Sequence, residues 1–156
     1  EEGAVFTLDT AQIGGVDSTV RKTEVYMEAD SKLYVMEKLM THDSQTAVSD
    51  MTVEMNGAGS SAQIVSRSVA KGNSVQTFHP IAIGNALCHA HVQCDSIIMD
   101  KAQISSIPEI NARDIDAQII HEAAIGRINN EQILKLRTFG MTEEEAEAVI
   151  IEDFLA

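Results

Sequence analysis

Two cysteines and two histidines stand close together near the middle of the chain, and their side chains could bind metal or sulfur. They are Cys88, His89, His91 and Cys94. Thiolate and imidazole are ligands that zinc and other transition metals accept. On a strand the two thiols would point to one face and the two imidazoles to the other, because side chains alternate. A zinc site built from all four would therefore need a loop or a bulge.

A second polar pair, His121–Glu122, directly follows the apolar run 117–120. An ionised glutamate is seldom buried without a partner, so Glu122 indicates either a strand end or a functional carboxylate. One interpretation is a metal-dependent hydrolase with Cys88, His89 and His91 as ligands and Glu122 as general base. The plainer alternatives are buried thiols that only pack and a histidine pair with ordinary hydrogen bonds.

Composition excludes several classes of protein. The 156 residues carry 24 acidic and 11 basic side chains, a net charge of −13, which argues against a nucleic-acid partner. Two cysteines are too few for a disulfide scaffold. No apolar run approaches the roughly 20 residues of a membrane span, and the N-terminus lacks the pattern of a signal peptide. We expect a soluble, cytoplasmic protein, and a chain that begins with Glu1 is expected to be a piece of a longer one.

The elements that must position these side chains are predicted to be mainly strands. Residues 31–41 and 47–55 alternate apolar and polar side chains with a period of two, and Gly, Asn, Ser and Asp clusters follow as turns. Residues 55–94 contain no Asp or Glu, and 72–94 carry no formal charge, which indicates a closed sheet or a subunit interface. The strand pattern alone fits a sandwich, a barrel or a β-solenoid.

The last residues of the chain are predicted to form a helical hairpin. Asn129 is predicted to be an N-cap that exchanges hydrogen bonds with Gln132. Gly140 is predicted to end this helix in the left-handed backbone conformation. Thr142 and Glu145 then form a capping-box pattern that starts a second helix. The sequence therefore predicts two domains, a β core over residues 1–128 and a helical hairpin over 129–156.

Five short blocks in fixed order resemble the C-terminal core of the SufB/SufD family. The blocks are 94–99 (CDSIIM), 107–110 (IPEI), 117–124 (AQIIHEAA), 131–132 (EQ) and 140–146 (GMTEEEA), closing on Phe154. The resemblance implies a right-handed parallel β-helix followed by C-terminal helices. It thereby favours the solenoid among the three folds that the strand pattern leaves open.

The same resemblance implies a subunit of the SUF iron–sulfur assembly scaffold rather than an enzyme. SufB-type chains carry a cysteine in the first block and a glutamate in the third, used to accept sulfur and bind a nascent, transient cluster. Cys94 and Glu122 occupy these positions, and His121 corresponds to a histidine implicated at the SufB–SufD interface. The implied partners are a SufC-type ATPase, a SufD-like or identical subunit, and a sulfur donor protein. A purely structural, SufD-like subunit is the alternative within the family.

The chain also departs from the family pattern. It lacks the long N-terminal part and stops at 154–156, where relatives often continue with further helix. Cys88, His89 and His91 lie outside the blocks that carry the resemblance. The resemblance therefore assigns them no role.

Overall fold

The structure, a computed structural model of residues 1–156, is built almost entirely from parallel strands followed by two helices. The strands are β1 (Val5–Ile13), β2 (Ser18–Met27), β3 (Lys32–Thr41), β4 (Thr46–Met55), β5 (Ser60–Ala70), β6 (Val75–Gly84), β7 (Cys88–Ile98), β8 (Gln103–Ser106), β9 (Glu109–Ala112) and β10 (Gln118–Gly126). The helices are α1 (Asn130–Thr138) and α2 (Glu143–Leu155).

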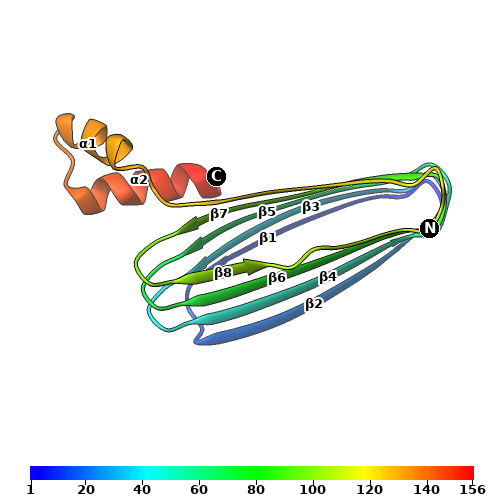
Figure 1. The fold of residues 1–156 in the computed structure, drawn as a ribbon, viewed down its shortest axis with the longest axis horizontal. Coiled ribbons are helices and arrows are strands. Elements are labelled where there is room, and N and C mark those ends of the chain that lie inside the picture. Colours follow the sequence, from blue (N-terminus) through cyan, green and yellow to red (C-terminus); the bar gives the residue numbers. More distant parts are fainter.

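The strands alternate between two facing sheets, so the chain winds as a solenoid of about four turns. One sheet has the order β1-β3-β5-β7-β10, and the other has the order β2-β4-β6-β8, with β9 also paired to β6. Figure 1 shows the two sheets as layers joined by turns at both ends. Every pairing is parallel, which confirms the predicted β-helix and excludes the sandwich and the barrel.

The alternation of side chains explains why these segments fold as strands. The predicted strands 31–41 and 47–55 are confirmed as β3 and β4, and Leu33, Val35, Met51 and Val53 point into the shared interior. The uncharged segment 72–94 covers β6 and most of β7, which are paired along both edges. Pairing along both edges does not by itself explain the missing charges, because β4 is also paired along both edges and carries Asp50 and Glu54.

The turns contain a repeat that is not visible as a repeated residue type. Asp43, Gly72 and Asp100 follow one another at intervals of roughly 28 residues, the length of one coil. All three have a positive φ, of 52°, 73° and 54°. At Gly72 a Cβ would lie 2.9 Å from the backbone nitrogen of Asp43 in the coil below, so glycine is required there. The repeated feature is a backbone conformation, which aspartate and glycine both adopt.

The predicted caps of the two helices are largely confirmed. Asn129 caps α1, but its side chain accepts from the Glu131 N–H rather than exchanging hydrogen bonds with Gln132. Gly140 ends the helix with φ of 93°. Thr142 and Glu145 form the complete capping box of α2. None of the helices is long and apolar enough to cross a membrane.

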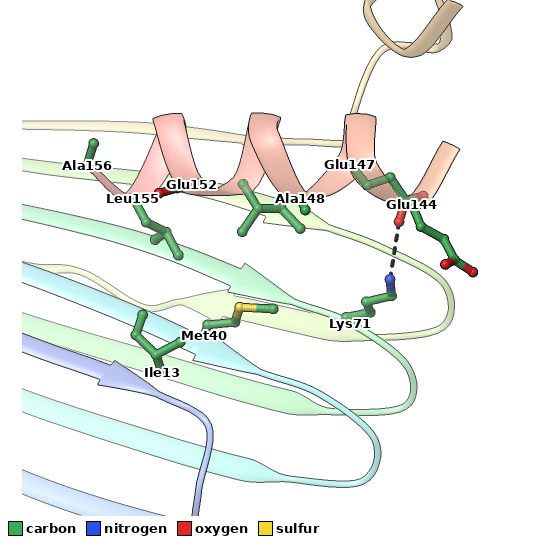
Figure 2. A pocket seen from close by; sticks show the side chains of 10 residues that line it. Ile13, Met40, Lys71, Glu144, Glu147, Ala148, Glu152, Leu155 and Ala156 are labelled. Atoms are coloured by element: carbon green, nitrogen blue, oxygen red, sulfur yellow. Dashed lines mark hydrogen bonds and ion pairs between the residues drawn. The ribbon is translucent and has the colours of Figure 1, made fainter. Parts of the chain in front are cut away.

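Helix α2 lies over the outer face of the β1-containing sheet, near the ends of its strands (Figure 1). Ile151 and Leu155 pack with Val69 and Met99 in a small second core. Beside this contact lies a groove of about 620 Å³, at whose edge Lys71 and Glu147 form an ion pair at 3.1 Å. Figure 2 shows the side chains that line the groove. Helix and sheet therefore share a core, and the division into two domains at residue 128 stays a prediction.

The stability of the solenoid is expected to depend on its inward side chains. Ile64 of β5 is 1% exposed, whereas its neighbour Gln63 points outward and is exposed. Ile64→Ala should lower the free energy of unfolding by about 2 to 5 kcal/mol because it leaves a cavity in a close-packed core. Gln63→Ala should change it by less than about 0.5 kcal/mol. Urea denaturation of both variants measures the difference, and equal losses would contradict this assignment of faces.

Candidate functional site

A row of mostly polar side chains crosses the interior of the solenoid between an apolar row, which contains Val35, Ile64 and Val92, and a row that contains Leu39, Ser68 and Ser96. In-register pairing stacks Thr10, Glu37, Ser66 and Cys94 on consecutive strands of one sheet, with Ala123 at the end. Successive members are about 4.8 Å apart, the spacing of paired strands. The row leads from the first coil to the last, and Cys94 lies one strand before its end.

Cys94 is buried against the last coil. Its side chain points inward from β7, the residue is 3% exposed, and its Sγ lies 3.4 Å from Nε2 of His121. Burial raises the pKa of the Cys94 thiol above 9.0, while the nearby Ser106 hydroxyl opposes this rise. Ser106 Oγ is nevertheless buried without a partner at normal hydrogen-bond distance and angle. The resting group is therefore a protonated thiol with an imidazole beside it.

His121 lies on β10, the edge strand of its sheet. It is in register with Val92 and shares the inward face, so it covers Cys94 from the open end of the solenoid. Partial burial lowers the pKa of His121 below 6.5. A neutral imidazole next to a thiol can accept its proton, which makes this pair chemically competent for sulfur chemistry.

Glu122 does not join this pair. It follows His121 directly, so strand alternation turns it to the outer face, where it is in register with Gln93. Its Oε2 lies 3.4 Å from Nε2 of His91, and its side chain is 64% exposed. Within a single chain, Cys94 and Glu122, which the resemblance assigns to one cluster site, therefore point to opposite faces.

The first cluster of possible ligands is also divided between two faces. Cys88 points inward and is 5% exposed, and burial raises the pKa of its thiol. His89 and His91 point outward, as the alternation predicts. No three His, Cys, Asp or Glu side chains anywhere in the chain come together as a metal site. The ligand set proposed for a zinc site or a hydrolase is not assembled.

The structure adds a buried carboxylate that the sequence analysis did not single out. Glu37 is 1% exposed, and its Oε2 accepts from the Arg21 guanidinium and from the Ser49 hydroxyl. Its other oxygen, Oε1, has no partner. A signal was present in the sequence, because Glu37 falls on the apolar phase of β3, between Val35 and Leu39. An acid at such a position is either paired or functional.

Comparison with known proteins gives one consistent result. Residues 1–154 match the family described as SUF system FeS cluster assembly, SufBD core domain. An iron–sulfur cluster assembly SufBD family protein of Methanocaldococcus jannaschii is 29% identical over 99% of this chain and 50% of its own length. A protein of the same description from Archaeoglobus fulgidus is 27% identical, over 99% of this chain and 42% of its own length. The chain thus spans half the length or less of these relatives.

The buried imidazole is expected to make the fold sensitive to acid. Because burial lowers the pKa of His121 below 6.5, the unfolded chain takes up this proton at a higher pH than the folded chain. The stability that neutral His121 contributes is present above pH 6.5 and is lost as the pH falls through and below that value. The urea midpoint of the wild type should therefore drop more between pH 8 and pH 5.5 than that of His121→Gln. His42→Gln, at an exposed site, should follow the wild type, and identical drops in all three proteins would contradict the role of His121.

Proposed function

Because the chain belongs to the SufBD family of iron–sulfur cluster assembly proteins, we propose that it is a SufB-like scaffold subunit. In this proposal the chain accepts sulfur on Cys94 and holds a nascent cluster for transfer. The observation that carries the proposal is the contact between the Cys94 thiol and the His121 imidazole, 3.4 Å apart at the last coil. In this proposal the role of the chain is assembly rather than catalysis.

Sulfur acceptance follows from the chemistry of this pair. The thiolate is the attacking species, and burial holds Cys94 in the thiol form at rest. His121 Nε2 is within reach of the thiol proton and can accept it when a sulfur donor protein presents its sulfur. A buried, protonated thiol is protected from oxidation. Because a base lies beside it, it can become a reactive thiolate when the sulfur donor binds.

The nascent cluster requires more ligands than Cys94 and His121 provide. Thiolate is the usual ligand of iron–sulfur clusters, and carboxylate and imidazole bind iron more weakly, which suits a site that must release its cluster. The interior beside Cys94 has room for about one water molecule and not for a cluster. We therefore place the cluster at the edge of β10, where Cys94 and His121 would bind it from the inner face and Glu122 from the outer face.

A second subunit would complete this site. As an edge strand, β10 has one side without a strand partner, and Ile120 and Ile125 on it are each 48% exposed. Unpaired edges with apolar side chains are the usual places for strand pairing between chains. A SufD-like or identical chain that pairs there would add ligands to those of His121 and Glu122, and it would cover the open end of the solenoid.

The helical hairpin is the proposed docking surface for a SufC-type ATPase in the cytoplasm. Leu134 and Phe139 of the α1 region are apolar and are 58% and 74% exposed. Exposed apolar side chains grouped on one small element indicate a protein interface. The ATPase would supply the energy of nucleotide hydrolysis to the assembly.

Anaerobic reconstitution with iron and sulfide tests the cluster site. Cys94→Ala and Glu122→Ala should both lose the visible absorbance and the protein-bound iron that the wild type acquires, because each variant removes a ligand from the proposed site. Iron and acid-labile sulfide are measured after gel filtration.

Cys88→Ala is the matched control for the loss of a buried thiol, and it should reconstitute like the wild type. If the Cys94 and Glu122 variants also keep the full absorbance, the scaffold role fails and the structural, SufD-like role is favoured. Stoichiometric zinc in the untreated protein would instead favour the hydrolase.

Binding of the ATPase can be measured separately from cluster formation. Phe139→Ala should weaken the affinity for a SufC-type ATPase, measured by calorimetry, by about tenfold or more, since exposed aromatic residues dominate such interfaces. Tyr26→Ala removes an aromatic side chain that is 61% exposed on the solenoid, far along the chain from the hairpin, and should leave this affinity unchanged. Equal affinities of all three proteins would place the docking surface elsewhere.

A further inference from the structure

We propose that the small cavity beside Cys94 is the binding site for the outer sulfur atom of a Cys94 persulfide. Ser66 is the positioning residue that keeps this space open. The inference rests on the proposed sulfur acceptance by Cys94 and adds where the accepted atom is held. It assigns a role to polar side chains of the solenoid interior that the cluster site does not use.

The cavity is closely matched to one atom. Its volume of about 10 Å³ has room for the centre of a single water-sized particle, and Cys94 is part of its wall. Ser66 stands directly between Glu37 and Cys94 in the inward row, paired in register with both. A serine there, between two larger side chains, leaves the space that a valine or leucine would fill.

Two buried acceptors without partners line the same cavity. Glu37 and Gln76 are 1% and 2% exposed, and Oε1 of each makes no hydrogen bond. The Glu37 carboxylate is fixed by Arg21 through its other oxygen, and the Gln76 amide is fixed because its Nε2 donates to Thr41 and to the Val69 carbonyl. Both side chains are therefore fixed in the cavity wall, and an unpaired buried oxygen is costly.

These acceptors determine which chemical groups the cavity can bind. Each acceptor needs a group that carries a hydrogen. The cavity therefore fits water in the resting protein, which can donate to both, and an S–H group after sulfur transfer, which can donate its one hydrogen to either Glu37 or Gln76. The perthiol Cys94–S–SH presents such a hydrogen on its outer sulfur. Two or more added sulfur atoms would not fit, so the cavity selects for transfer of a single atom.

The last coil provides the entrance. Ser106 and Ile104 of β8 line the cavity and are only partly buried, and β8 is the last strand of its sheet. On the opposite sheet His121 covers Cys94 from β10. A sulfur donor therefore reaches the thiol between β8 and β10 without unfolding the coils behind it.

Inorganic polysulfide can supply the sulfur in a test without a donor protein. The Cys94 sulfur attacks a terminal sulfur of the polysulfide and forms a new S–S bond. The adjacent S–S bond of the polysulfide breaks, and its electron pair leaves with the shortened polysulfide dianion. The proton of the Cys94 thiol ends on the outer sulfur of the perthiol, so the charge balances and no oxidant is needed.

The experiment uses Cys88→Ala as background, so that Cys94 is the single thiol of the chain. This protein is treated with inorganic polysulfide, and the gain of sulfur is measured by intact mass and by cyanide-released thiocyanate. Cys94 should gain one sulfur atom and no second one. Ser66→Val in this background should lower the persulfide yield by about tenfold or more, because added methyl groups occupy the cavity.

Ser66→Ala is the matched control, since it removes the hydroxyl but leaves the space, and it should keep the yield of the background protein. Ser66→Thr adds one methyl group with the hydroxyl retained and should lower the yield even if Ser66→Val fails to fold, as judged by circular dichroism. Equal yields in the folded Val or Thr variant and in Ser66→Ala would overturn the cavity assignment alone. If the background protein itself gains no sulfur, the proposed sulfur acceptance by Cys94 fails with it.

Discussion

Parallel, in-register pairing between successive coils is the constraint on which the rest of this structure depends. Each residue is paired with the residue one coil later, so a side chain keeps its face along the whole sheet. This pairing builds the apolar interior rows around Leu33 and Ile64, and it also builds the polar row that contains Cys94. Because the side-chain period is two, a shift of one residue moves a group from the interior to the surface. Cys94 and Glu122 are separated by this rule, although their strands are neighbours.

The polar row has an energetic cost that a purely structural solenoid would avoid. Glu37 is held in the interior with only one of its two oxygens paired, and replacement of a whole buried ion pair such as Arg21–Glu37 by apolar side chains is often neutral or stabilising. Serines at the adjacent positions leave space instead of filling it. Polar groups without hydrogen-bond partners do not improve packing. Their position beside a thiol is consistent with a site that binds and releases a small group.

The open end of the solenoid connects this interior to its surroundings. The β10 edge leaves His121 partly covered, and the same strand carries the outward Glu122. One strand therefore contributes to two faces. In the proposed function the inner face handles a single sulfur atom and the outer face meets iron and a second subunit, and this division would explain how a thiol that is 3% exposed can belong to a cluster site.

The sequence by itself determined the local structure and the family. Period-two alternation identified β3 and β4, the caps at Asn129 and Thr142 located both helices, and the short blocks from Cys94 onward indicated the family that the comparisons then showed. These features depend on residues close together along the chain. The sequence did not reveal the repeat of coils, because its turns conserve a backbone conformation and not a residue type.

Only the tertiary structure decided which side chains meet. The partner of Cys94 is His121 and not Glu122, and Glu37 shares its cavity although 57 residues separate them in the chain, two coils of roughly 28 residues each. These contacts follow from the register between coils, which depends on the exact length of every turn. Alternation within one strand says that two residues share a face, but it cannot say which residue of the next coil lies opposite them.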